Sequence, residues 1–201
     1  MRLSRASWWL MLALAPAAEG AELLHEVESR LEHARVTRGE FVEEKRLVGV
    51  ERPLKGRGSF LVDRERGVLW RTLAPFPSVL KITRGEIVQT DGKQVLMRLA
   101  AEREPAVKAV SAVLFATFAA DLGALAQYFD FAGGVDGGRW HLKLTPKEPG
   151  LARVIRVLEL DGAQSVRRVD LTATSGDLLH LEFRQVESAG APTAAETAEL
   201  D

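Results

Sequence analysis

Short apolar runs alternate with polar residues along most of the chain, a pattern that is typical of β-strands. Between Val36 and Leu99 these runs are rich in Val, Ile, Leu, Phe and Trp, and turn-forming residues separate them at short intervals. Such spacing predicts about six consecutive antiparallel strands. The strongest hairpin signal is Asp91 followed by Gly92, because a type I′ turn needs positive φ at both central residues.

A second group of about four strands is expected nearer the C-terminus. In the first of them apolar residues at every second position alternate with charged or polar ones, which predicts one buried and one solvated face. Turn signals again separate the runs. The expected strands are Arg139–Leu144, Val154–Leu160, Ser165–Thr172 and Leu178–Val186.

Helical spacing occurs before and between these two groups of strands. Glu22–Ala34 has apolar residues three or four positions apart, which predicts an amphipathic helix. Pro105 suits the first turn of a second helix, where its missing amide hydrogen has no cost. Asp121 is a good N-cap for a third helix at Leu122–Tyr128, because its carboxylate can accept from the exposed amides there.

The order of these elements predicts the fold class. A helix, about six strands, a helical insert and about four strands indicate a mainly β (α+β) protein, and the sequence shows no internal repeat. A long sheet of consecutive hairpins tends to curl. We therefore expect a single curved antiparallel sheet, an open half-barrel, whose concave apolar face is covered by helices.

The first 20 residues have the features of a cleavable signal peptide. Arg2 and Arg5 precede the apolar run Trp8–Ala15, which is too short to span a bilayer but suits a secretory signal. A cut after Gly20 fits the small residues there, and a cut after Ala17 is the alternative. No later segment is long and apolar enough to span a membrane, so we expect a soluble protein exported to the periplasm.

The remaining chain fits one ordinary domain. We expect a signal peptide at 1–20, the half-barrel domain at 21–190 and a C-terminal tail at 191–201. Thr193 and Glu196 have the spacing of a capping box, so this tail could form a short helix.

Composition excludes several kinds of chemistry. There is no cysteine, so disulfides, thiolate metal sites, cysteine nucleophiles and lipidation of a terminal cysteine are ruled out. A formal net charge of -1 argues against nucleic-acid binding. Between Lys45 and Arg84, however, there are ten basic residues and only three acidic ones. These side chains could simply lie on the solvated faces of strands, or they could contact an acidic lipid or partner surface.

No motif indicates an enzyme. The histidines, at positions 25, 33, 141 and 180, lack metal-ligand spacing, and neither a His-Glu-x-x-His nor a Gly-x-Ser-x-Gly run occurs. We therefore expect no catalytic residues, no metal site and no cofactor.

A series of short motifs extends over most of the chain. They are Phe41, Glu43, Gly58, Phe60, Val62, Arg64, Trp70, Pro75, Asp91, Gly92 and Lys93, followed by Leu144, Thr145, Pro146 and Lys147. In this order and spacing they resemble the LolA-like periplasmic carriers of outer-membrane lipoproteins. Glu43 and Glu65 are departures, since the family usually has glutamine and proline there.

The resemblance implies both fold and function. Members of this family are half-barrels with a helical lid, and they hold the acyl chains of a lipoprotein in the apolar cavity between sheet and lid. It implies a monomeric carrier that receives lipoprotein or a related lipid from an inner-membrane donor complex and delivers it to an outer-membrane acceptor. Arg64 falls on the family's arginine that latches the lid, a role that suits the several donors of a guanidinium.

We expect the cavity to be lined from both the sheet and the lid. The expected lining residues are Phe41, Phe60, Val62, Trp70, Leu80 and Ile82 from the sheet, with Val110, Leu114, Phe115 and Phe118 from the lid.

Other functions stay open at this stage. Phe76, Pro77 and the turn at Arg52–Leu54 resemble a divergent subgroup of carriers associated with aryl-polyene or glycolipid export, so the cargo could differ. The same fold could also serve a periplasmic sensor or adaptor that binds a regulatory partner. A lipid-ester hydrolase ranks last, because the sequence offers no set of catalytic residues.

Overall fold

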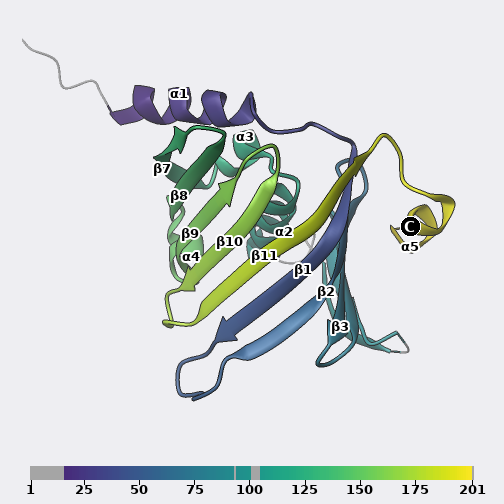
Figure 1. Cartoon of the computed structure of the whole chain (residues 1–201). Helices are drawn as coiled ribbons and strands as arrows, with labels where there is room; N and C mark the ends of the chain where they lie inside the picture. Colours follow the sequence, from purple (N-terminus) through teal and green to yellow (C-terminus); the bar gives the residue numbers. More distant parts are fainter. Residues whose placement is uncertain (1–15, 93, 101–104, 201) are drawn as a thin grey trace, which may run out of the picture.

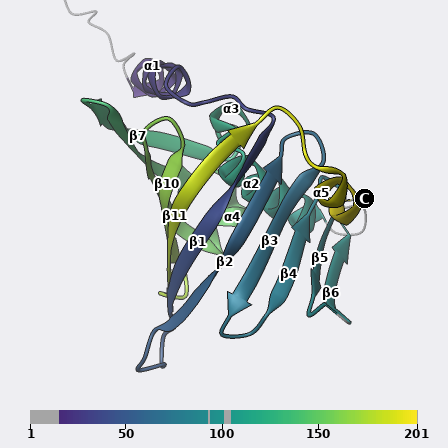
Figure 2. The ribbon, with the colours of Figure 1, turned by 45° about the vertical axis from the view of Figure 1, so that its right-hand side comes forward.

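The computed structural model describes residues 16–92, 94–100 and 105–200, with side chains described from Gly20 onward and, in the helix that begins at Pro105, from Ser111 onward. Its main feature is one eleven-stranded antiparallel sheet bent into an open half-barrel (Figures 1 and 2). The strands are β1 (Val36–Arg46), β2 (Leu54–Asp63), β3 (Gly67–Ala74), β4 (Ser78–Ile82), β5 (Glu86–Thr90), β6 (Val95–Ala100), β7 (Phe129–Asp136), β8 (Arg139–Pro146), β9 (Ile155–Gly162), β10 (Val166–Ala173) and β11 (Leu178–Ala189).

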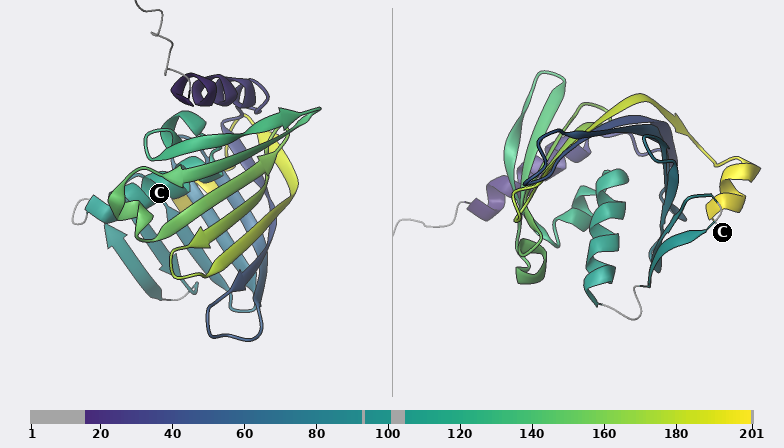
Figure 3. Two further views of the ribbon diagram at one scale, coloured as in Figure 1. Left: turned by 90° about the vertical axis from the view of Figure 1, so that its left-hand side faces the viewer. Right: turned by 90° about the horizontal axis from the view of Figure 1, so that it is seen from below.

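The two groups of strands join through the first and last strands of the chain. The strand order is β6-β5-β4-β3-β2-β1-β11-β10-β9-β8-β7, so β1 pairs with both β2 and β11. In this register Phe41 lies opposite Phe183. Viewed from below, the strands form an arch with β6 and β7 at its two ends (Figure 3).

Glycines allow the sheet to bend where β1 meets β2. On the concave face Gly39 pairs with Phe60, and Gly58 pairs with Phe41. A Cβ on Gly39 would come within 2.9 Å of the Phe60 ring, and one on Gly58 would lie 1.9 Å from the carbonyl oxygen of Arg71. Because neither contact is sterically allowed, only glycine lets each aromatic ring cover the backbone of the opposite strand.

The helices cover different parts of this sheet. They are α1 (Pro16–Glu28), α2 (Pro105–Phe118), α3 (Leu122–Leu125), α4 (Pro149–Ala152) and α5 (Ala194–Leu200). The helix α2 lies inside the arch, where it contacts β3 to β6, α3 and α4 (Figure 3). The helix α1 packs against β7 and α3 at one end of the sheet. None of the described helices combines the length and hydrophobicity needed to cross a bilayer.

The C-terminal helix packs on the outer face of the sheet. Leu200 is buried there in a small second core with Val36, Leu61 and Leu69. Glu196 completes the capping box: its carboxylate accepts from the Thr193 amide at 2.7 Å, and the Glu196 amide donates to the Thr193 hydroxyl at 3.2 Å. The tail is thus held against the half-barrel.

The expected fold class is confirmed: the sheet is single, antiparallel and open, and helices cover it. Asp121 caps α3 as expected, because its carboxylate accepts from the Ala124 amide at 2.9 Å. Residues 1–15 of the signal peptide expected at 1–20 lie outside the described residues. Residues 16–20 form the start of α1.

Three details of the sequence interpretation were wrong. The helix expected at Leu122–Tyr128 ends at Leu125. The first helix ends at Glu28 rather than Ala34, because the chain leaves it to cross to β1 and the Glu32 amide donates to the Gln164 carbonyl at 2.8 Å. The glycine-rich segment at 133–138 contains the second half of a strand, β7, rather than only a turn. Gly133 fits this strand because a Cβ there would lie 2.0 Å from the His141 carbonyl oxygen.

We predict that Gly58→Ala destabilises the protein by about 2–4 kcal/mol, because the new methyl group must displace backbone as well as the Phe41 ring. Gly134→Ala is the matched control, since a Cβ at this other strand position meets nothing within 4 Å. Urea unfolding followed by tryptophan fluorescence measures both changes. Equal stability of the two variants would contradict this account of the bend.

Candidate functional site

The concave face of the sheet and α2 meet in a cluster of aromatic side chains. The Phe41 and Trp70 rings stack with centroids 3.7 Å apart, and Phe118 from α2 approaches Trp70 at 4.9 Å. Phe183 from β11 lies 5.1 Å from Phe60 and 6.4 Å from Phe118. The cluster therefore joins β1, β2, β3 and β11 to the end of the inner helix.

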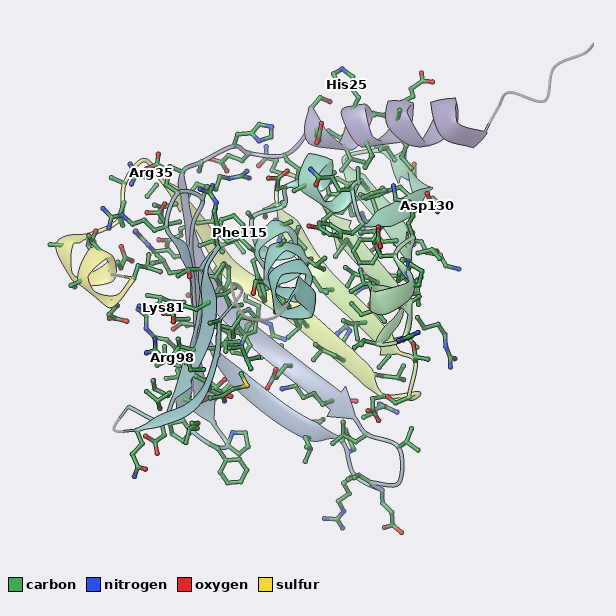
Figure 4. The ribbon with its side chains drawn as sticks, turned by 180° about the vertical axis from the view of Figure 1, so that it is seen from behind. His25, Arg35, Lys81, Arg98, Phe115 and Asp130 are labelled. Atoms are coloured by element: carbon green, nitrogen blue, oxygen red, sulfur yellow. The ribbon has the colours of Figure 1, made fainter. Side chains whose placement is uncertain are left out.

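The expected lining residues gather in this region. Phe41, Phe60, Val62, Trp70 and Ile82 are all buried in the main core, and Leu80 packs against it while partly exposed. From the inner helix, Leu114, Phe115 and Phe118 are also partly buried against the same core; Figure 4 shows Phe115 on α2 inside the hollow of the sheet. Val110 belongs to the part of α2 whose side chains are not described.

Sequence reasoning missed Phe183 and Val113. Phe183 follows Leu179 and Leu181 at alternate positions of β11, and all three contribute to the main core. This alternation could have identified Phe183 as an inward-facing residue. Val113 is buried on α2 at 4% exposure, but the helix is apolar on nearly every side, so periodicity could not select its inward positions.

Little space is left between the sheet and the C-terminal end of α2. A cavity of about 40 Å³ lies beside the aromatic cluster, lined by Phe60 and Phe183 from the sheet and by Thr117 and Phe118 from α2. This volume holds a few water molecules, whereas ordinary ligand pockets have about 300–1,000 Å³. We call this arrangement, in which α2 lies in the hollow and its C-terminal end packs on the aromatic cluster, the closed form.

Arg64 faces the same small cavity, close to the C-terminal end of α2. Its Nε atom donates to the Ala34 carbonyl at 3.1 Å, in the segment that leads into β1. Among the described residues its guanidinium makes no hydrogen bond to α2. Arg64 is thus placed where the latch role implied by the resemblance requires it, but it does not form the latch hydrogen bond to α2 in this structure.

Two hydroxyl groups are buried on α2, and they differ in their partners. The Thr117 hydroxyl donates to the Val113 carbonyl at 2.8 Å, one turn earlier in the helix. The Ser111 side chain is 1% exposed, and its oxygen has no hydrogen-bond partner within the described part of the chain. An unsatisfied buried hydroxyl costs about 1–3 kcal/mol. The closed position of α2 is therefore less stable than its apolar surface alone would make it.

The outer face of β8 to β11 is polar and charged. His180 is bonded to the Asp170 carboxylate and lies 3.5 Å from Glu182, and these contacts raise the pKa of His180 despite its partial burial. Asp170 also pairs with Arg168 at 3.0 Å. No group of three or more histidine, aspartate or glutamate side chains among the described residues is arranged to hold a metal ion. These contacts stabilise a solvated sheet face.

The comparisons with known proteins agree with this geometry. Residues 15–200 match the family model described as "Outer membrane lipoprotein carrier protein LolA-like". No match is found among curated proteins.

Solved structures share the fold at low identity. An outer membrane lipoprotein-sorting protein domain from Vibrio parahaemolyticus is 9% identical with a TM-score of 0.51, over 92% of this chain and 99% of that one. A DUF1329 family protein from Desulfovibrio piger is 10% identical with a TM-score of 0.50, over 92% and 99% of the two chains. The MucA/MucB complex of Pseudomonas aeruginosa gives 16% identity and a TM-score of 0.49, over 91% and 60%.

We predict that the imidazole of His180 titrates with a midpoint above 6.5, the value from which its pKa is raised. The pKa of His180 is higher in the folded than in the unfolded state. The stabilisation from the Asp170 pair is therefore complete below the unfolded-state pKa and is lost as pH rises through the folded-state pKa. NMR titration of His180 in wild type and in Asp170→Asn measures the shift. Asp130→Asn, at an exposed position, should leave the midpoint unchanged, and an unshifted wild-type midpoint would contradict the prediction.

Proposed function

The chain belongs to the LolA-like family of outer membrane lipoprotein carriers, and on that basis we propose that it binds acyl chains of lipoproteins, or of a related lipid, between the concave sheet and α2. Members of this family are periplasmic binding and carrier proteins rather than enzymes. In the proposed cycle the protein takes its cargo from an inner-membrane donor complex and passes it to an outer-membrane acceptor. It works as a monomer, without cofactor or metal.

The observation that carries the proposal is the nature of α2. Its sequence from Pro105 to Phe118 contains a single charged residue, Lys108, and it lies in the hollow of a sheet whose concave face is apolar. A helix that is apolar nearly all round needs apolar surroundings. An acyl chain needs the same surroundings, so helix and cargo can compete for one surface.

The energies of the two occupants can be compared. Withdrawing the buried Val113 and the partly buried Leu114, Phe115 and Phe118 would cost less than the roughly 1.5–3 kcal/mol each of full burial, or several kcal/mol together. Burying an acyl chain of ~15 carbons would return about 12 kcal/mol, at ~0.8 kcal/mol per methylene. The gain from the acyl chain exceeds the loss from these side chains, so cargo can displace the helix.

Two polar features favour movement of α2 out of the hollow. The unsatisfied hydroxyl of Ser111 would regain hydrogen bonds to water once α2 moves out. Arg64 stands beside the cavity at the end of α2. In the proposal it is the latch, and because it makes no hydrogen bond to α2 among the described residues, the helix can leave without breaking one to it.

The test is binding of acyl probes by the purified protein. We expect saturable binding of a fluorescent fatty acid and of an acylated lipopeptide, and lipid in an extract of protein prepared gently from periplasm. The unacylated peptide is the control and should not bind. Protein that binds neither probe and carries no lipid would contradict the carrier function and favour an adaptor that binds a regulatory partner.

A variant on α2 tests the competition directly. We predict that Ser111→Ala stabilises the closed form by about 1 kcal/mol and weakens probe binding by roughly fivefold, because the probe must displace a more stable helix. Thr117→Val is the matched control, since the Thr117 hydroxyl already has a partner and its removal should give no gain in stability. Urea unfolding and probe titration measure the two effects. A stabilised Ser111→Ala variant with unchanged affinity would show that α2 stays in place.

A further inference from the structure

The exposed apolar side chains of this protein are gathered at one end of the half-barrel. That end, here called the loop rim, consists of residues 45–55, 73–79, 89–92, 94–96, 152–156 and 172–179. Within the described part of the chain, every large apolar side chain that is strongly exposed belongs to it. They are Leu47, Val48, Val50, Leu54, Leu73, Phe76, Val95, Leu96, Val154 and Leu178.

The strand pairing places these segments along one edge. Arg46 of β1 pairs with Leu178 at the start of β11, and Lys45 pairs with Leu54 at the start of β2. The loops also touch, because the Val48 amide donates to the Asp177 carboxylate at 2.8 Å. Figures 1 and 2 show the β1–β2, β3–β4, β5–β6 and β10–β11 connections together at the lower end of the sheet.

The opposite end of the sheet has no comparable surface. Its turns, at 64–66, 83–85, 137–138 and 163–165, contain no large apolar residue at all. Side chains such as Phe76, which is 82% exposed, therefore mark one end of the molecule. An exposed apolar surface of this extent in a folded protein indicates a site of interaction.

The loop rim carries basic side chains beside its apolar ones. Its segments contain six basic and three acidic residues, and Lys45, Arg46 and Lys55 pair with Glu43 and Glu44 next to the rim. The rim's other basic residues, Arg52, Arg153 and Arg156, have no ion pair within the described part of the chain, and they lie among the exposed apolar side chains. Apolar tips with basic flanks complement an anionic bilayer surface, which takes up both kinds of group.

We infer that the loop rim is a membrane-docking surface, through which the protein rests reversibly on a bilayer that contains anionic lipid. Four of the apolar side chains, Leu47, Val48, Val50 and Phe76, lie on the loops that connect β1 to β2 and β3 to β4, so they can enter the headgroup region without a matching partner surface. The inference stands on exposure and charge alone and does not depend on acyl chains binding beneath α2. If both hold, docking brings the end of the sheet close to the membrane that supplies or receives the lipid.

Vesicle co-sedimentation of the full chain tests this inference. We expect the protein to bind phosphatidylcholine vesicles that contain phosphatidylglycerol, to bind pure phosphatidylcholine more weakly, and to lose part of its binding at high salt. The double change Phe76→Ser and Val48→Ser should weaken binding to the mixed vesicles by at least about tenfold, because two exposed side chains lose their apolar contact with the bilayer. Both positions are exposed, so the fold should be unaffected, which circular dichroism checks.

Matched charge reversals separate the rim from general electrostatics. Arg52→Glu, in the rim, should weaken binding to the mixed vesicles alone, whereas Arg139→Glu, exposed at the opposite end, should not. Equal effects of the two reversals would overturn the inference, as would wild type that stays in solution or a double variant that binds like wild type. Self-association of wild type without vesicle binding, abolished by the double change in light scattering, would assign the rim to a second copy instead.

Discussion

The concave face of the sheet must be kept from water, and the burial of that face against α2 is the interaction on which the rest of the structure depends. The glycines opposite Phe41 and Phe60 let these rings pack over the facing strand. The aromatic cluster then connects strands from both halves of the sheet to Phe118. Without an occupant in the hollow, the apolar side chains of several strands would be exposed, at a large cost in free energy.

This constraint does not specify which apolar body fills the hollow. The helix α2 does so in the closed form, with a cavity of about 40 Å³ beside its C-terminal end, and in the proposed function an acyl chain takes its place. The buried hydroxyl of Ser111 lowers the stability of the closed form. A carrier needs such a balance, because an interior that was packed too well would exclude its cargo, and one that was empty would collapse or aggregate.

Much of the fold could be predicted from the sequence because its signals are local. Alternation of apolar and polar residues in Trp140–Leu144 reports the two faces of a strand, and Asp121 and Thr193 cap helices through contacts within one turn. The strand β7 was missed because Gly133 and its neighbours suggest a turn, while the close approach to His141 that requires glycine is visible only across the pair.

The site was less predictable because it depends on pairing over long sequence separations. The alternation in β11 could have identified Phe183 as an inward residue, but its contact with Phe60 and Phe118 follows from the β1–β11 pairing, which no local pattern encodes. The hydrogen bond from Arg64 to Ala34 likewise depends on how the chain crosses from α1 to β1. How far α2 fills the hollow is a matter of packing, which composition does not specify.

The central claim, that cargo and α2 compete for the same surface, is tested most directly by a distance. Since the chain has no cysteine, Ala112→Cys on α2 and Lys143→Cys on the outer face of β8 can carry the only two spin labels. Double electron–electron resonance should give one narrow distance distribution for the free protein and a longer, broader one when an acylated lipopeptide is bound. An unchanged distribution at saturating lipopeptide would contradict the account.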